Sequence, residues 1–301
     1  MTWILLVLLY GLLKGAREIT KKLAMNKNSV MEVLVTYTII SFILVIPQAP
    51  NAGGLETRFY FYIAIKSFCI FVAWICSFRS LKKLPISLFG ILDLSRVLFA
   101  TSLGILFLGE VLSIYQVIGL IIVCSGLILL RFRPGSLKRN KIENQSGENA
   151  LPSPQEKPEE KKYTLYIILA LISCILNATS GFMDKILMKD VTSSQLQFWY
   201  MLFLVIYYLI YILVTREKIS ISVLKNGWIW LLAIMFVIGD KALFIANGME
   251  ESKVTMMTLI KQAGCLVTIL GGKFIFKEKN IGWRLFCACV IITGIVLGVM
   301  K

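Results

Sequence analysis

The stretch LKKLPISLFGILDLSRVLFATSLGILFLGEVLSIYQVIGLIIVCSGLILL, residues 81–130, is largely repeated later in the chain. A forward shift of 168 positions places Glu110 on Glu278 without a gap. The same shift places SGLIL, which begins at Ser125, on TGIVL, which begins at Thr293. This similarity indicates an internal repeat, and a repeat determines the architecture that the chain can form.

The beginning of the chain shows the same relationship. A shift of 163 positions aligns KLAM at residues 22–25 with KILM at residues 185–188, and Tyr37 with Tyr200. The sequence therefore consists of two related halves.

The composition indicates an integral membrane protein. Of the 301 residues, 57% are hydrophobic, against about 45–50% in ordinary soluble domains. No residue is a histidine, so the commonest general base and metal ligand is missing, which disfavours a membrane enzyme. The seven cysteines all lie in apolar segments, at spacings that match neither a disulfide framework nor a metal site.

Apolar runs of roughly 20 residues recur along the chain, each long enough to cross a bilayer as a helix. Only closed hydrogen-bonding structures are stable there, so the fold class is all-α and integral to the membrane. We predict ten transmembrane helices, five in each half, at residues 3–22, 31–47, 59–80, 86–108, 113–131, 164–187, 194–214, 227–249, 254–276 and 283–300.

The distribution of positive charge predicts the orientation. Lysine and arginine number 21 after odd-numbered spans and four after even-numbered spans, so the odd side is cytoplasmic by the positive-inside rule. Both termini would then lie outside a cell membrane. Because five spans is an odd number, the second half enters the membrane inverted relative to the first.

Three regions follow from these assignments. Residues 1–131 form the first five-helix repeat and residues 164–301 form the second. Between them, residues 132–163 are rich in Lys, Glu, Asn, Ser and Pro. Such a segment cannot bury enough apolar surface to fold, so we predict a disordered cytoplasmic tether.

Several short patterns occur at the ends of the predicted spans: Leu84-Pro85, Leu108-Gly109-Glu110 and its echo Lys277-Glu278, with glycines in the fifth and tenth spans. In these features the chain resembles EamA-type proteins of the drug/metabolite transporter (DMT) superfamily, which have two five-span repeats. One departure is Tyr10-Gly11, where such proteins commonly have tryptophan and glycine. The resemblance implies a transporter whose substrate belongs to a wide range: amino acids, sugars, nucleotide sugars, phosphorylated metabolites, quaternary amines or drugs.

Ionisable side chains inside the spans are the best pointers to a substrate site, because they are costly in a bilayer and usually face a cavity. Lys14, Arg17, Glu18 and Lys21 share one face of the first span. A snorkelling lysine, or a local pair between Lys14 and Glu18, is the structural alternative. The 163-position shift maps this face onto a second polar stripe that includes Asn177 and Asp184, for which packing through small polar residues is the alternative.

The fourth span contributes Asp93 and Arg96, one turn apart and able to pair. The counterpart of Asp93 in the second half is Lys261, which precedes Gln262. Opposite charges thus occupy equivalent positions, and a structural ion-pair network competes with a substrate contact as the explanation.

The third and eighth spans add Lys66, Asp240 and Lys241. Asp240 and Lys241 are neighbours and point in different directions, so at least one should face a cavity. Trp74 shares a face with Phe71 and Phe78, which could hold a cation or planar group or could simply pack together.

The leading hypothesis is a secondary active transporter that works by alternating access around a cavity formed by spans 1, 3, 4, 6, 8 and 9. A mildly positive interior favours a small anionic or zwitterionic metabolite, with Lys14, Arg17 and Arg96 on its anionic group and an acid such as Asp93, Asp184 or Asp240 carrying a coupling proton.

The alternatives are an exporter of cationic drugs or quaternary amines, a membrane-embedded enzyme or lipid-processing protein, and a scaffold. Partners would be the substrate and the bilayer, without cofactor, metal or nucleic acid, in a monomer or homodimer. No GxxxxGK[ST] sequence indicates an ATP-driven pump.

Overall fold

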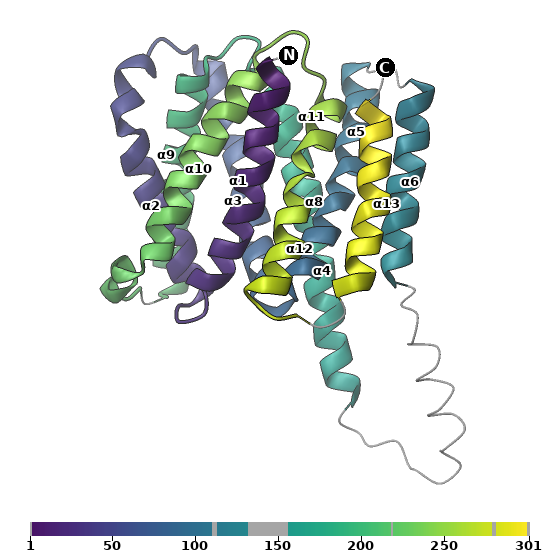
Figure 1. The fold of residues 1–301 in the computed structure, drawn as a ribbon. Helices are drawn as coiled ribbons and strands as arrows, with labels where there is room; N and C mark the ends of the chain where they lie inside the picture. Colours follow the sequence, from purple (N-terminus) through teal and green to yellow (C-terminus); the bar gives the residue numbers. More distant parts are fainter. Residues whose placement is uncertain (1, 110–112, 132–155, 218, 279–280, 300–301) are drawn as a thin grey trace, which may run out of the picture.

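The computed structural model describes residues 2–109, 113–131, 156–217, 219–278 and 281–299, and this part of the chain is helical, without a strand (Figure 1). Its elements are α1 (Thr2–Ala24), α2 (Val30–Val45), η1 (Ile46–Asn51), α3 (Thr57–Lys83), α4 (Ile86–Leu92), η2 (Asp93–Ser95), α5 (Arg96–Leu108), α6 (Ile114–Arg131), α8 (Glu156–Leu187), α9 (Ser193–Thr215), η3 (Ile221–Lys225), α10 (Gly227–Asn247), α11 (Val254–Lys261), α12 (Gly264–Phe274) and α13 (Ile281–Val299).

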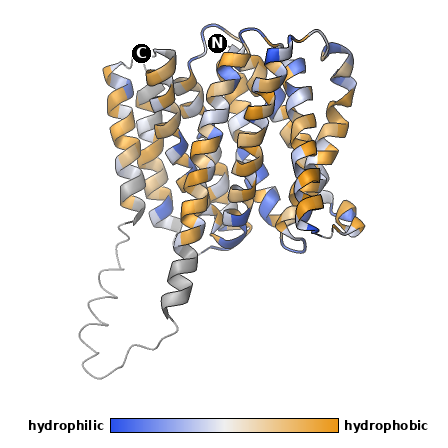
Figure 2. Ribbon diagram, turned by 180° about the vertical axis from the view of Figure 1, so that it is seen from behind, coloured by the Kyte–Doolittle hydropathy of each residue, from blue (hydrophilic) through white to orange (hydrophobic). Residues whose placement is uncertain are grey.

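Six helical stretches in the described residues are long and apolar enough to cross a membrane. They are Val30–Asn51, Thr57–Lys83, Ile86–Phe107, Thr164–Leu187, Ser193–Thr215 and Gly227–Asn247, and shorter apolar helices cover Ile114–Gly126 and Gly282–Gly294. Large apolar side chains such as Leu106, Phe61 and Leu213 are exposed on the outer surface, which suits a lipid environment. Figure 2 shows this predominance of apolar residues along the helices. The expected all-helical membrane protein is confirmed.

The two halves use the same devices at equivalent helix ends. Ser29 caps α2 in a capping box with Glu32, and Thr192, 163 positions later, caps α9 in a capping box with Gln195. Such a box satisfies backbone N–H groups that the first turn of a helix leaves free. The repeat in sequence is therefore also a repeat in local structure.

The fourth and ninth predicted spans each change from regular α-helix for about one turn part-way along, and we call these two places the helix breaks. Residues 86–108 divide into α4 and α5 at η2, and residues 254–276 divide into α11 and α12 at Gln262 and Ala263. Ile86–Phe107 nevertheless forms one helical stretch of membrane length, as predicted. The 168-position shift superimposes Asp93–Ser95 on residues 261–263, so both halves break at the same place.

The first helix of each half packs against the other half. α1 lies against α10, α11 and α12, whereas α8 lies against α3 and α5. Figure 1 shows that α1 begins at the edge where both chain ends lie, whereas α8 runs toward that edge from the opposite side; α6 and α13 lie side by side at one end of the molecule. α8 begins at Glu156, ahead of the predicted start at residue 164, and residues 132–155 lie outside the described part of the chain.

Candidate functional site

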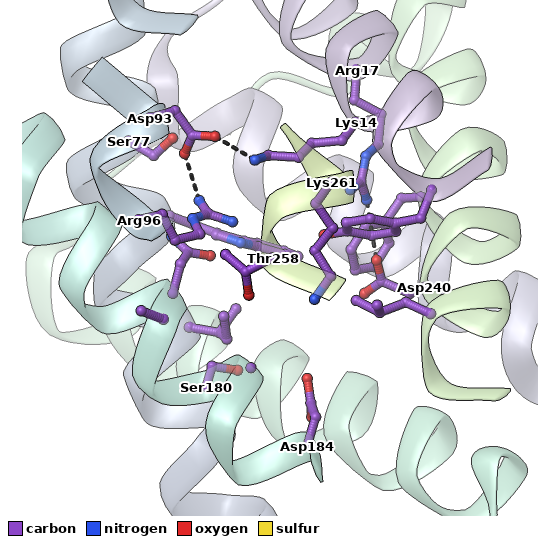
Figure 3. A pocket seen from close by; sticks show the side chains of 18 of the residues that line it. Lys14, Arg17, Ser77, Asp93, Arg96, Ser180, Asp184, Asp240, Thr258 and Lys261 are labelled. Atoms are coloured by element: carbon purple, nitrogen blue, oxygen red, sulfur yellow. Dashed lines mark hydrogen bonds and ion pairs between the residues drawn. The ribbon is translucent and has the colours of Figure 1, made fainter. Parts of the chain in front are cut away.

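A cavity lies between the two halves, at the level of the two helix breaks (Figure 3). Its walls come from α1, α3, the α4–α5 break, α8, α10 and α11, as the predicted cavity requires, with Tyr37 of α2 and Tyr200 of α9 in addition. Eleven of the thirteen predicted site residues line it: Lys14, Arg17, Glu18, Lys66, Trp74, Asp93, Arg96, Asn177, Asp184, Asp240 and Lys261.

Asp93 lies in the first helix break and forms ion pairs with two basic side chains. Arg96, one turn further along, donates from Nη2 to Asp93 Oδ1 at 2.7 Å, and Lys14 of α1 donates from Nζ to the other carboxylate oxygen. The thiol of Cys174 on α8 lies 3.9 Å from Asp93 Oδ1. The local pairing of Lys14 with Glu18 does not form, because Lys14 reaches across to Asp93 and Glu18 instead accepts from Lys21 at 2.7 Å.

Arg17 and Asp240 form a second ion pair, in which Arg17 Nη1 donates to Asp240 Oδ1 at 3.2 Å. The guanidinium also lies over two rings, 5.2 Å from the centroid of Tyr10 and 5.1 Å from that of Phe236. Cation–π contacts of this kind stabilise a charge that has little access to water. Arg17 is thus held by groups of the protein itself.

Lys66 and Asp184 form the most deeply buried pair. The ammonium nitrogen lies 2.8 Å from Asp184 Oδ1 in an ion pair, and the Lys66 residue is 1% exposed. The same nitrogen lies 3.7 Å from the ring centroid of Tyr200 and 4.6 Å from that of Phe244. This pair joins α3 of the first half to α8 of the second.

Lys261 differs from the other cations of the cavity. It lies in the second helix break, and within the described residues no carboxylate forms an ion pair with it and no hydrogen bond reaches its ammonium group. The nearest recorded contact is the ring of Tyr10, whose centroid is 5.7 Å from Nζ. Figure 3 shows its side chain extending into the space between the Asp93 cluster and Asp240.

The charges of the cavity wall do not balance. Six basic residues, Lys14, Arg17, Lys21, Lys66, Arg96 and Lys261, face four acidic ones, Glu18, Asp93, Asp184 and Asp240. Three acids pair one to one, and Asp93 serves both Lys14 and Arg96. The positive excess is therefore concentrated at the two helix breaks, which is where an anionic group of a ligand would be attracted.

Two predicted residues do not line the cavity. Lys241 points to the other side of α10, where its ammonium donates to Gln48 Oε1 and Ser194 Oγ, both at 2.8 Å. Gln262 is 1% exposed and packed inside the second break. Neither residue lines this cavity: they neighbour residues that do, Asp240 and Lys261, and adjacent helical residues point in different directions.

Of the predicted aromatic set, Trp74 alone lines the cavity. Phe78 stacks on Tyr37 and Phe71 packs against Tyr208, so these two belong to the helix packing. The cavity also includes uncharged polar residues that the sequence did not single out, among them Ser77, Asn247 and Thr258. Thr258 precedes Lys261 by three positions, so helical spacing could have placed the two on one face of α11.

The pattern of the EamA-like transporter family matches residues 1–132 and 164–300. The chain belongs to the EamA-like transporter family. Its members are membrane transporters of the DMT type, so the chain is a multi-pass membrane transporter rather than a soluble protein, and the resemblance inferred from the sequence is confirmed.

Comparisons with curated proteins and with solved structures give information on the fold and none on the substrate. Among the curated proteins compared, none matches the chain. A solved structure described as "Crystal structure of protein" has a TM-score of 0.65 and 14% sequence identity, over 99% of this chain and 97% of that one. At that identity the similarity is one of fold.

Proposed function

We propose that the chain is a secondary active transporter that moves a small anionic or zwitterionic metabolite by alternating access. The two halves, inverted relative to each other, would rock around the cavity that contains the two helix breaks. Support comes from the repeated position of the breaks and from the opposite directions in which α1 and α8 run in Figure 1. Broken helices at corresponding positions of two repeats are typical of the midplane substrate sites of such transporters.

The single observation that carries the substrate class is the state of Lys261. An ammonium group inside a membrane protein is costly unless it has a partner or reaches water. Lys261 lacks an ion pair among the described residues while the other basic side chains of the cavity have one. A carboxylate or phosphate of the substrate would supply the missing charge, with Lys14 and Arg96 close enough to assist.

Proton coupling would need an acid that can become neutral during the cycle. Asp93 is a poor candidate, since two cations favour its ionised form. Asp184 and Asp240 each have one basic partner. We therefore assign the coupling role to one of these two acids.

The test is flux and binding with purified protein in vesicles, using a panel of anionic, zwitterionic and cationic metabolites. Lys261→Gln should weaken binding of the transported anion by more than about tenfold, because a hydrogen bond to a charged group contributes about 1.5–3 kcal/mol. Lys241→Gln is the matched control, since it removes the same charge outside the cavity. Equal transport by both variants, or transport limited to cations, would overturn the assignment.

A further inference from the structure

The start of α4 is held by residues of the other half of the chain. Glu278, which follows α12, accepts hydrogen bonds from the backbone N–H groups of Ile86 at 2.6 Å and Ser87 at 3.3 Å. It also accepts from the Ser87 hydroxyl group. Arg284 of α13 donates to the same carboxylate at 2.8 Å and reaches the Ser87 hydroxyl as well.

This arrangement is unusual as a helix cap. The first N–H groups of a helix have no partner inside it, and normally the residue just before the helix supplies one. α4 is preceded by Pro85, which makes no side-chain cap. The cap comes instead from a residue 192 positions away. Gly272 permits the approach, because a Cβ there would lie 3.0 Å from Glu278 Oε2.

The same segment has a separate anchor within its own half. Lys22, at the end of α1, donates from Nζ to the carbonyl oxygen of Leu84 at 2.6 Å. The second half repeats this contact, since Lys185 donates to the Ser252 hydroxyl at 2.8 Å, and the pair is related to Lys22 and Leu84 by the repeat shifts. Lys22 also lies over the ring of Phe276, 5.3 Å from its centroid, so it reaches the segment that carries Glu278 as well.

We propose that Glu278 is a positioning residue that latches the two halves together on the face where α4 begins, and that its release from α4 opens the cavity to that face. α4 packs against α12, and it ends at Asp93, which lines the cavity. Separation of the start of α4 from Glu278 would thus open a route beside α4 and shift the Asp93 cluster. This inference rests on the alternating-access mechanism proposed above. The sequence counterpart Glu110 lies outside the described residues.

The experiment measures access to the cavity directly and does not need the substrate. Ser77 lines the cavity from α3 and is 6% exposed. In a background with the seven native cysteines replaced by alanine, Ser77→Cys is reacted with a charged, membrane-impermeant thiosulfonate reagent applied to one face at a time. Glu278→Ala should speed the reaction from the face where α4 begins by about tenfold or more, the equivalent of one charge-assisted hydrogen bond.

Two further variants separate the latch from a general loss of structure. Glu278→Gln keeps an acceptor for the Ile86 N–H but loses the charge that pairs with Arg284, so it should give a smaller increase from the same face. Glu56→Ala, in a surface pair with Arg58, is the matched control and should leave the rate unchanged. Unchanged labelling in Glu278→Ala, or an equal increase from both faces, would overturn the latch. Failure of every anion in the flux panel, with one-sided labelling intact, would instead overturn the substrate class alone.

Discussion

The two helix breaks have the same position in the repeat but opposite chemistry. At the first, Asp93 is surrounded by Lys14, Arg96 and the Cys174 thiol, so the break is closed by ion pairs. At the second, Lys261 has no ion pair within the described residues, and Gly264 stands where the first break has Arg96. The backbone break is thus shared scaffold. The difference in side chains gives the two cations of one break a shared carboxylate and leaves the cation of the other without one.

The largest difference in stability between the two helix breaks is expected when Asp93 is neutralised. Asp93→Asn leaves two buried cations, Lys14 and Arg96, without a counter-charge. Removal of one partner of a buried ion pair typically costs about 3–5 kcal/mol, so the free energy of unfolding should fall by about that amount. A decrease in the melting temperature of the purified protein in detergent, calibrated by denaturant unfolding, measures it.

Lys261→Gln is the matched neutralisation at the second break. Since Lys261 has no ion-pair partner to leave behind, its loss should change the melting temperature little or raise it. Equal destabilisation by the two variants would mean that Lys261 is paired as fully as Asp93 is, and the distinction between the breaks would fail.

Hydropathy was enough to predict the six helical stretches of membrane length, because a bilayer imposes length and apolarity on each one separately. The breaks were not predicted, since neither Asp93–Ser95 nor residues 261–263 contain proline or glycine. The first break packs against α8, whereas the second packs against α1. The partners of Lys14 could not be predicted either: helical spacing fits Glu18, and only folding brings Asp93, 79 positions away, within reach.

Because spacing in the sequence says nothing about tertiary contacts, Lys241 was also placed among the cavity residues. Adjacency predicted that Asp240 and Lys241 point in different directions, and they do, but it cannot say which of them faces the interior. Asp240 lines the cavity and Lys241 binds Gln48 and Ser194. Sequence therefore identified the charged residues of the cavity wall, whereas the pairing pattern that separates the two breaks required the structure.

A middle-sized effect should follow from closing the space at Gly264. A Cβ there would lie 2.3 Å from the carbonyl oxygen of Gly11 and 3.1 Å from the backbone nitrogen of Gly15, so α1 would have to move. Gly264→Ala should lower the free energy of unfolding by about 1–3 kcal/mol, the usual cost of overpacking. Gly282→Ala, where an added Cβ meets nothing within 4 Å, is the control in the same melting assay. Equal melting temperatures would show that the second break is not held against α1.

The smallest effect concerns the contacts that α1 and α8 make with the two breaks. Cys174 is the 163-position counterpart of Gly11; its thiol lies 3.7 Å from the Leu92 carbonyl oxygen, and a Cβ at Gly11 would lie 3.3 Å from the equivalent oxygen of Ile260. Because a thiol is a weak donor, Cys174→Ala should lower the free energy of unfolding by less than about 1 kcal/mol. Gly11→Ala should cost more, since its Cβ would also lie 3.1 Å from the Lys261 carbonyl oxygen. If the order of the two melting temperatures were reversed, the contact of α8 with the first break would contribute more to stability than the contact of α1 with the second.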